Sequence, residues 1–361
     1  MASEDVAADR DAFVEHVFGS MLGFFEILAI NLGARLGLYS ALMEGGALTS
    51  GELADRAGIH ERYAREWLEQ QATAGILRAD LSDRTAPRFV LPPGHAEVLM
   101  DRDSLSYMGA SARQLLSLPS VFELVVEACR TGGGVPYDAY GLDSVEGQGA
   151  ANRPIFLTTL PHEWLPAIPV LHDRLTRGPA AHVVDVGCGV GWSSIAIATA
   201  YPNVWVDGFD PDETSVERAH ENAEEAGVAD RVRFHARDAA AVGDGGPIDV
   251  ATAFECIHDM ARPVDVLSAI LAAMSDDGAM LIVDERTREV FSGEPDPLES
   301  YLYGWSLFDC LPAGMFDAPS AGTGTVMRPS TLHAYAQEAG FTRFEVLPIE
   351  HDAFRLYLLQ P

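Results

Sequence analysis

"VVDVGCGVGWSSIAIA" (Val183–Ala198) is the stretch that decides the fold of this chain. It opens with apolar, β-branched residues, passes through three glycines at alternate positions, and continues into residues that form helices. This order predicts a buried strand, a tight turn and the first turn of a helix, an arrangement that binds nucleotides at the helix N-terminus.

Strands and helices alternate on the carboxyl-terminal side of this stretch. The predicted strands contain "HVVDVG", "WVDGFD", "VRFHAR", "IDVATAF" and "AMLIVDE", with helical segments between them. "RFEVLPIE" is a late antiparallel candidate, and "FRLYLLQ" is the final strand. We expect an α/β fold, a Rossmann-like doubly wound parallel sheet that binds its ligand at the carboxyl ends of the strands.

The amino-terminal part is mainly helical. Apolar residues at helical spacing predict two amphipathic helices within residues 10–43, meeting near Gly33 or Gly37. A helix capped by Thr49 or Ser50, a second helix from His60 and two short β segments then form a winged-helix pattern. A helix that binds DNA needs a basic face. In this second helix, however, acidic residues alternate with the arginines. We therefore expect a structural winged helix used for dimerisation.

We expect three parts along the chain. Residues 1–130 form the helical and winged-helix domain, and residues 131–175 are a linker with helices that border the site. Residues 176–361 form the nucleotide-binding domain. Within it, the aromatic stretch 290–326 breaks the alternation, so we expect an irregular insertion that lies over the crevice as a lid.

Composition narrows the function. The 361 residues include 54 acidic and 24 basic residues, and every basic residue is arginine, so a Schiff-base lysine and a Walker-type lysine are excluded. A net charge of −30 disfavours nucleic acid as a partner. The four cysteines form no CxxC pair, and the amino terminus lacks the pattern of a signal peptide. Polar residues at 26, 31 and 35 interrupt the most apolar segment, so we expect no membrane span and a cytoplasmic protein.

The glycine turn disfavours a dinucleotide. A dinucleotide fingerprint has its third glycine at the position that Trp192 occupies here. Asp185 stands two residues before the first glycine, where a carboxylate can recognise a cationic amino-acid group and would repel a phosphate.

"DVGCGVG" resembles the first motif of class I S-adenosylmethionine (SAM) dependent methyltransferases. Asp210, in "VDGFDPD", matches the residue that hydrogen-bonds the ribose hydroxyls, and Asp238, in "FHARDAA", matches the residue that accepts from the adenine amino group. With the winged helix, most of the chain is similar to small-molecule O-methyltransferases and to actinobacterial natural-product methyltransferases. The resemblance implies SAM as cofactor, S-adenosylhomocysteine (SAH) as product, a small-molecule substrate, and a homodimer interlocked by the amino-terminal helices. The expected cofactor-binding residues are Asp185, Gly187, Gly189, Gly191, Trp192, Asp210, Pro211, Asp238, Ala239 and Phe254.

"FECIHDM" resembles the O-methyltransferase segment whose histidine is the general base, so His258 is expected to remove the acceptor's proton. Glu163 and Glu255 are further catalytic candidates near the crevice. The family pattern has tryptophan where this chain has Met260, so the acceptor atom, oxygen or carbon, stays open. The expected substrate pocket is apolar or aromatic, for a bacterial secondary metabolite, and is lined by Tyr137, Tyr140, Trp164, Met260, Tyr303, Trp305, Phe308 and Met315.

Three alternatives remain open. The sequence also resembles iron-dependent C-methyltransferases that act on keto acids. This resemblance implies that His258, Asp259 and Asp309 would hold Fe²⁺. The family pattern, however, has histidine at the position of Asp309. A SAM-binding enzyme that catalyses a rearrangement without methyl transfer would keep the same cofactor motifs. A ligand-responsive transcription regulator would use the winged helix to bind DNA.

Overall fold

The computed structural model describes residues 3–243 and 246–361. The chain divides into two compact units, Met1–Leu116 and Ser117–Pro361, and each is described by itself. The domain boundaries expected at residues 130 and 175 stay predictions.

The first unit begins with one long helix, α1 (Ser3–Arg35), followed by α2 (Leu38–Gly45). The expected break is at Gly37, which adopts a left-handed conformation with φ of 66°. By length and hydropathy alone the segment Asp5–Arg35 is apolar enough to cross a membrane, so the expectation of no membrane span stays a prediction. A cytoplasmic location stays a prediction.

A winged helix follows, as the sequence predicts. It comprises α3 (Ser50–Ala57), α4 (Glu61–Thr73) and the antiparallel strands β1 (Arg78–Asp80) and β2 (Arg88–Val90). Thr49 and Glu52 form a capping box at the start of α3, and Gly58 ends that helix with φ of 67°. The arginines of α4 pair with acids on the same helix, Arg65 with Glu61 at 2.8 Å and Arg62 with Glu66. The helices α5 (Pro93–Met100) and α6 (Gly109–Leu115) complete the unit.

The second unit is built on a seven-stranded sheet of order β5-β4-β3-β6-β7-β9-β8. Strands β3 to β7 are parallel, β9 runs antiparallel to β7, and β8 runs antiparallel to β9, which confirms the antiparallel prediction for "RFEVLPIE". The strand order reverses between β3 and β6, and ligands bind at such a reversal in open α/β sheets. The strands are β3 (Ala181–Val186), β4 (Val204–Asp210), β5 (Val232–Ala236), β6 (Ile248–Phe254), β7 (Met274–Glu285), β8 (Arg343–Val346) and β9 (Phe354–Gln360).

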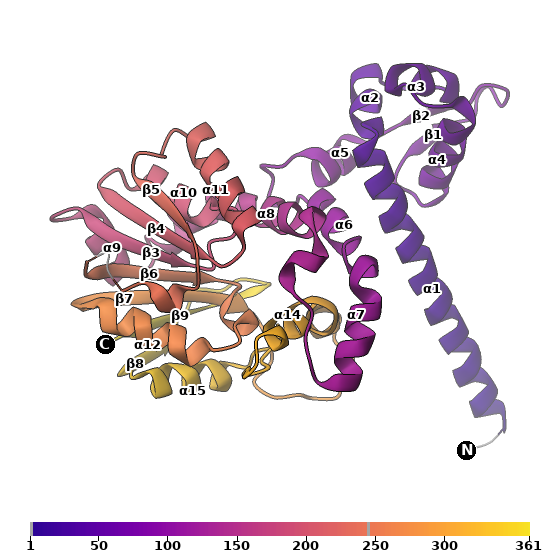
Figure 1. Ribbon diagram of the computed structural model, residues 1–361. Helices are drawn as coiled ribbons and strands as arrows, with labels where there is room; N and C mark the ends of the chain where they lie inside the picture. Colours follow the sequence, from indigo (N-terminus) through magenta and orange to yellow (C-terminus); the bar gives the residue numbers. More distant parts are fainter. Residues whose placement is uncertain (1–2, 244–245) are drawn as a thin grey trace. The chain divides into compact units, whose positions relative to one another are not determined.

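Helices cover both faces of this sheet (Figure 1). One face packs on α9 (Pro169–Thr176), α10 (Trp192–Ala200) and α11 (Glu213–Glu225). The other packs on α12 (Pro263–Ala273) and α15 (Pro329–Ala339). The unit begins with α7 (Leu118–Thr131), the 3₁₀ turn η1 (Tyr137–Tyr140), α8 (Leu142–Leu157) and the π-helix η2 (Leu160–Trp164).

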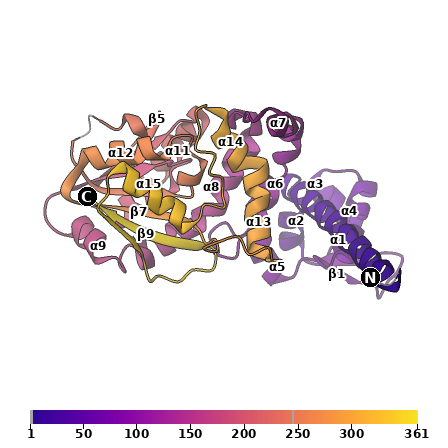
Figure 2. The same cartoon turned by 90° about the horizontal axis from the view of Figure 1, so that it is seen from below.

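The insertion 290–326 is mainly helical, so the expectation of an irregular segment was wrong. It forms α13 (Pro297–Trp305), the π-helix η5 (Ser306–Cys310) and α14 (Leu311–Phe316), visible in Figure 2. Two backbone hydrogen bonds join it to the region of η4 (Ile257–Asp259): Gly324 N donates to His258 O at 3.0 Å and Ala321 N to Ala261 O at 2.8 Å. Gly314 allows close approach, because a Cβ there would lie 2.8 Å from Asp259 O. The insertion therefore borders the carboxyl end of β6.

Candidate active site

The glycine turn between β3 and α10 has a backbone that only glycine adopts easily. Gly187, Gly189 and Gly191 have φ of 64°, 51° and 85°. A Cβ on Gly191 would lie 2.6 Å from Phe234 Cζ, whereas a Cβ on Gly189 would meet no atom within 4 Å. Gly191 is thus required for packing of the turn against β5, and Gly189 faces open space in front of it.

Asp185 is entirely buried behind this turn. Its Oδ2 accepts from Ser193 Oγ at 2.5 Å and Ser194 Oγ at 2.6 Å, and its Oδ1 accepts from Thr252 Oγ1 at 2.7 Å. Burial raises its pKa, and these hydroxyls oppose that rise. The carboxylate therefore ties the start of α10 to β6, and none of its surface is exposed to a ligand.

Two further carboxylates follow the next strands in the order that the sequence predicts. Asp210, at the end of β4, accepts from Gly189 N and from Asp212 N, both at 2.9 Å. Burial raises the pKa of Asp210 to about 6. Asp238 is exposed after β5 and accepts from Ala240 N at 2.8 Å. The turn, Asp210 and Asp238 thus lie along the carboxyl ends of β3, β4 and β5.

His258 lies beyond the end of β6 and is 2% exposed. Its Nδ1 lies 2.8 Å from Asp284 Oδ1 and 3.2 Å from Glu285 Oε2, both at the end of β7. A carboxylate at Nδ1 favours the tautomer with the proton on that nitrogen and leaves Nε2 to accept a proton. Asp284 and Glu285 were missed in the sequence, although two acids at the end of a predicted parallel strand were a usable signal.

Charges strongly shift the pKa values in this cluster. Burial alone would lower the pKa of His258, but the carboxylates of Asp284, Glu285 and Asp259 outweigh it and hold the pKa well above its usual value. Burial raises the pKa of Glu255 to about 7, with the negative charges of Asp284 and Asp259 adding to the rise and the positive charge of His258 opposing it. Glu255 also has φ of 52°, the one positive φ of a non-glycine residue in the described chain. Strain of this kind is concentrated at functional sites.

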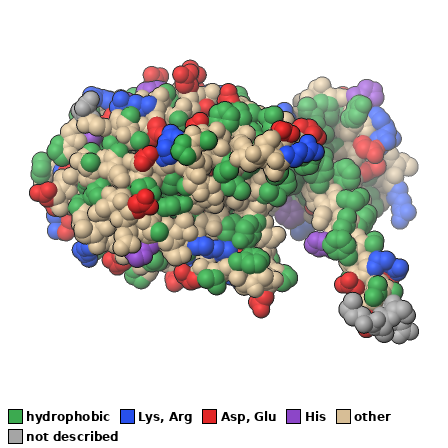
Figure 3. Space-filling model, turned by 60° about the horizontal axis from the view of Figure 1, so that its bottom comes forward, with side chains coloured by type: hydrophobic (Ala, Val, Ile, Leu, Met, Phe, Trp, Pro, Cys, Tyr) green, Lys and Arg blue, Asp and Glu red, His purple; other side chains and the backbone are tan. Residues whose placement is uncertain are grey.

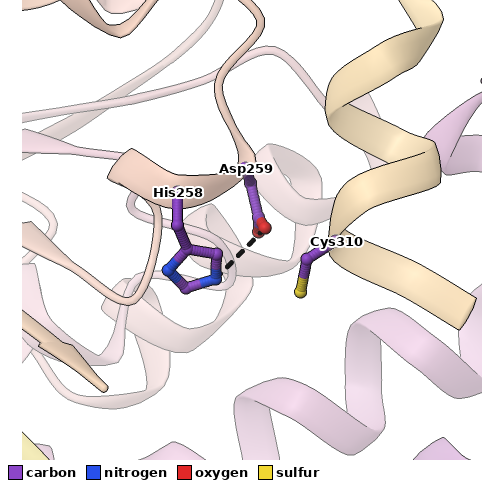
Figure 4. Close-up of side chains that lie close together, drawn as sticks. All are labelled: His258, Asp259 and Cys310. Carbon is purple, nitrogen blue, oxygen red and sulfur yellow. Dashed lines mark ion pairs between the residues drawn. The ribbon is translucent and has the colours of Figure 1, made fainter. Parts of the chain in front are cut away.

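On its other side His258 faces Asp259 and the insertion, as Figure 4 shows. Its Nε2 lies 3.2 Å from Asp259 Oδ1, and ligand atoms of His258, Asp259 and Cys310 lie within 4.8 Å of one another. The sequence-based metal set named Asp309 in this position, but the structure brings its neighbour Cys310 into the group. The π-helix η5 determines that residue 310 rather than residue 309 joins this group, and the periodicity of the sequence does not reveal a π-helix.

Tyr137 is the predicted pocket residue most clearly tied to the site. It is 38% exposed, and its ring centroid lies 6.3 Å from that of Tyr140 in the same turn. Burial of the rest of the side chain raises its pKa well above the usual value, and the charges of Asp309, Asp210 and Asp259 add to the rise. Tyr301, which was not predicted, has its pKa raised by burial and by the charges of Glu255 and Glu285.

Other predicted residues lie elsewhere. Trp164 is core rather than pocket, packed against His351 and Phe354 with ring centroids 5.5 and 6.2 Å away. Glu163 is exposed, and its charge acts on His351 rather than on His258. Tyr303 accepts from Arg328 Nη2 at 3.1 Å.

The remaining predicted pocket and cofactor residues range from core positions to exposed ones. Tyr140 is core, and its hydroxyl donates to Phe308 O at 2.9 Å. Phe254 packs on Phe156 with ring centroids 5.1 Å apart, and the guanidinium of Arg153 lies 4.9 Å from the ring centroid of Trp192. Pro211 is exposed, Ala239 is buried, and Met260, Trp305 and Met315 are half-buried.

Comparison with known proteins gives the family. Residues 178–300 match the family model described as a methyltransferase domain, and residues 26–101 match the Rv2258c-like winged HTH domain. The 27-O-demethylrifamycin SV methyltransferase of Amycolatopsis mediterranei (strain S699) is 32% identical over 191 residues, which are 49% of this chain and 69% of that protein. The chain belongs to the SAM-dependent methyltransferases.

Solved structures show the same fold for this methyltransferase over nearly its whole length. The mitomycin 7-O-methyltransferase MmcR has a TM-score of 0.72 and 22% identity, covering 98% of this chain and 99% of that one. Human N-acetylserotonin methyltransferase in complex with SAM has a TM-score of 0.65 and 17% identity, covering 100% and 99%. The SAM-dependent methyltransferase therefore combines a winged-helix unit with a SAM-binding sheet, and SAM is its cofactor.

Proposed function

We propose that this methyltransferase transfers the methyl group of SAM to an oxygen atom of a small apolar or aromatic secondary metabolite. The observation that carries this proposal is the placement of His258, held by Asp284, beyond β6 and beside the strands that carry the cofactor motifs. The curated relative named 27-O-demethylrifamycin SV methyltransferase and the fold relative named mitomycin 7-O-methyltransferase support oxygen as the acceptor atom.

The residues around the turn fit SAM. The open space in front of Gly189 leaves room for a ligand against the backbone, and the carboxylate of Asp210 can accept from ribose hydroxyls. Asp238 would accept from the adenine amino group. Asp185 would act indirectly, by fixing the start of α10, because its oxygens already accept three hydroxyl protons.

SAM supplies a methyl group on a sulfonium leaving group, so the protein mainly aligns the acceptor and removes a proton. Asp284 orients His258 through Nδ1, and Nε2 takes the proton of the acceptor hydroxyl as the oxygen–methyl bond forms. The proton then rests on the imidazole beside carboxylates that stabilise its charge.

The raised pKa of His258 predicts the pH dependence of the rate. Below that pKa the base is an imidazolium, so the neutral fraction and kcat should rise about tenfold per pH unit and level off well above pH 6.5. The test is SAH formation from a panel of phenolic natural products at saturating SAM, across pH. A rate that falls as the pH rises would contradict the role of His258. A substrate converted while SAM stays intact would favour the rearrangement alternative.

A second candidate is metal-assisted methyl transfer, because His258, Asp259 and Cys310 could hold a metal ion. His258 donates from its other nitrogen to Asp284, as metal-binding histidines commonly do. Nitrogen, oxygen and sulfur donors suit Zn²⁺ or Fe²⁺. A metal ion held by them would activate the acceptor hydroxyl as a Lewis acid.

Metal content separates the two candidates. For metal-assisted transfer we expect about one equivalent of metal per chain, lost in Cys310→Ala and kept in Cys129→Ala, which alters an exposed cysteine. Metal is measured by mass spectrometry, and binding of added Co²⁺ by its visible absorption. Full SAH formation by metal-free protein would exclude this candidate.

We also propose a homodimer formed through α1. Large apolar side chains of α1 between Val6 and Leu32 are exposed, and Figure 3 shows hydrophobic side chains along this part of the helix, although such surfaces are ordinarily covered. A second copy of this helix is a matching apolar partner, whereas the winged-helix arginines are already paired with acids and do not favour DNA. The exposed residues of α1 include Val6, Phe13, Val14, Val17, Phe18, Met21, Leu22, Phe24, Phe25, Leu28 and Leu32.

We expect Phe18→Glu with Phe25→Glu to convert the dimer to a monomer, since each would place a charge in an apolar interface. Light scattering after gel filtration should give twice the mass of one chain for the wild type and the mass of one chain for the variant. Phe291→Glu, at a site 72% exposed in the second unit, is the control and should stay dimeric. A monomeric wild type, or wild type that sediments with lipid vesicles, would contradict this proposal.

A further inference from the structure

Three hydrogen-bonded side chains cross neighbouring strands of the sheet, and we call them the His–Asp–His row. His182 Nε2 lies 2.8 Å from Asp207 Oδ2, and His235 Nε2 lies 2.8 Å from Asp207 Oδ1. His182 stands near the start of β3, Asp207 in the middle of β4 and His235 near the end of β5. The row therefore runs diagonally toward the carboxyl ends of the strands, where the cofactor motifs lie.

The row ends against the aromatic ring of Phe209. The imidazole of His235 stacks on this ring, with centroids 4.7 Å apart and an angle of 23° between the planes. Phe209 is 3% exposed, and its carbonyl oxygen accepts from Gly187 N at 2.8 Å and from Cys188 N at 3.1 Å. Gly187 and Cys188 begin the glycine turn, so the row contacts the residue whose carbonyl holds that turn.

The surroundings of His182 require the charged imidazolium. Its Nε2 faces Asp207, and its Nδ1 lies 3.3 Å from Pro247 O. A carboxylate and a carbonyl can only accept, so the ring makes both hydrogen bonds only when both nitrogens carry a proton. Pro247 immediately precedes β6, in the connection from β5 that also contains Asp238. A protonated His182 thus joins β4 to the connection that carries the proposed adenine acceptor.

The pKa values agree with this charge state. The hydrogen bond to Asp207 raises the pKa of His182, although burial opposes the rise. Burial alone would raise the pKa of Asp207, but the hydrogen bonds and charges of both histidines lower it to about 2. Asp207 therefore stays ionised near neutral pH, and a proton lost from the row leaves a histidine.

Four other charged side chains face the row. Asp249 of β6 accepts from His182 N at 2.7 Å and pairs with Arg174 of α9 at 2.6 Å. Arg233 and Arg237 lie over aromatic rings of β4, at 5.9 and 5.2 Å from the ring centroids. Imidazole is the side chain that changes charge near neutral pH, so the two histidines carry the titration of this group.

We propose that the His–Asp–His row makes the affinity for SAM depend on pH, with His182 and His235 as positioning residues that act through Phe209 and the glycine turn. The inference rests on the proposed placement of SAM at that turn and does not depend on the acceptor. Protonated histidines make charge-assisted hydrogen bonds to Asp207, which hold Phe209 and the connection from β5 in place. Loss of a proton weakens these bonds and loosens the turn.

The sign of the pH dependence follows from His182. Because its folded pKa is raised, its contribution is complete below pH 6.5 and is lost as the pH rises through the raised value. Affinity for SAM and SAH should therefore fall with increasing pH above neutrality. Since coupling between two sites is reciprocal, binding of SAH should also cause uptake of protons in this range.

The test measures SAH affinity and proton uptake for the full chain by calorimetry between pH 7.0 and 8.5, in buffers of different ionisation enthalpy. This range lies above the pKa of Asp210, about 6, so the proposed ribose acceptor stays ionised. We expect the wild-type affinity to fall about fivefold across the range, with net proton uptake on binding.

Two variants make the test specific. His182→Gln with His235→Gln keeps an N–H donor at each position but removes the titration, so most of the fall in affinity and of the proton uptake should disappear. His333→Gln is the matched control, because His333 also stacks on a phenylalanine, Phe344, with centroids 4.7 Å apart. This pair lies at β8, the opposite edge of the sheet from β5, so the control should keep the wild-type profile.

The inference is overturned if the double variant keeps the wild-type slope of affinity against pH, even when its affinity is lower at every pH, because the row would then be merely structural. Wild-type affinity that rises with pH, or proton release on binding, would also overturn it. Failure of the proposed methyl transfer is a separate result, since these measurements use SAH without an acceptor.

Discussion

His258→Ala is expected to lower kcat by about 10²- to 10⁴-fold and to leave the affinity for SAH within about twofold. The imidazole is the proposed acceptor of the substrate's proton, since Asp284 holds its Nδ1 at 2.8 Å and its Nε2 faces the insertion, 3.2 Å from Asp259 Oδ1. It also lies beyond β6, while the residues proposed to hold SAM follow β3, β4 and β5, so cofactor binding should survive its removal. Single-turnover SAH formation and SAH calorimetry measure the two quantities.

Two further variants make the result specific. His172→Ala removes another half-buried imidazole, one near Tyr201 rather than the acid cluster, and should leave kcat unchanged. Asp284→Asn removes the largest charge that raises the pKa of His258, so the pH at which kcat levels off should fall. If His258→Ala keeps wild-type kcat, the proton acceptor is another group. If the metal content falls along with kcat, His258 is a ligand instead.

Gly191→Ala is expected to lower the free energy of unfolding by about 2–4 kcal/mol and to weaken SAH binding by more than tenfold. The added Cβ meets a left-handed backbone with φ of 85°, and it would lie 2.6 Å from Phe234 Cζ and 3.0 Å from Ala219 Cβ. The turn must then move away from β5, and with it the amide of Gly189 that Asp210 accepts from. Denaturant unfolding and calorimetry with SAH test the two effects.

Gly178→Ala provides a matched control. Gly178 also has φ of 85°, but a Cβ there would meet no atom within 4 Å. This variant should cost only the backbone strain, about 1 kcal/mol, and should bind SAH like the wild type. Equal losses in the two variants would show that packing at the turn does not matter.

Much of the fold was predictable because its signals are local. The glycine turn requires a backbone that other residues resist, and Thr49 with Gly58 marks both ends of a helix. Asp210 was identifiable because it ends a strand next to the turn. These features depend on residues near one another in the sequence.

The acceptor side of the site was less predictable because several elements build it. Asp284 meets His258 only because β6 and β7 are neighbours in the sheet. Whether position 309 or 310 faces His258 depends on the extra residue per turn of a π-helix. Trp164 looked like a pocket residue in the sequence, but a large aromatic side chain is equally suited to a core.

The bonds between the insertion and η4 have a consequence for which substrates react. Gly324 N donates to His258 O, and Gly314 lies against the backbone of Asp259, so a shift of the insertion would also displace His258. A bulky substrate that pushes the insertion outward would still bind. Its reacting atom would, however, be misaligned with the proposed base. Discrimination by size would therefore appear in kcat, with KM almost unaffected, and poor substrates would behave as inhibitors.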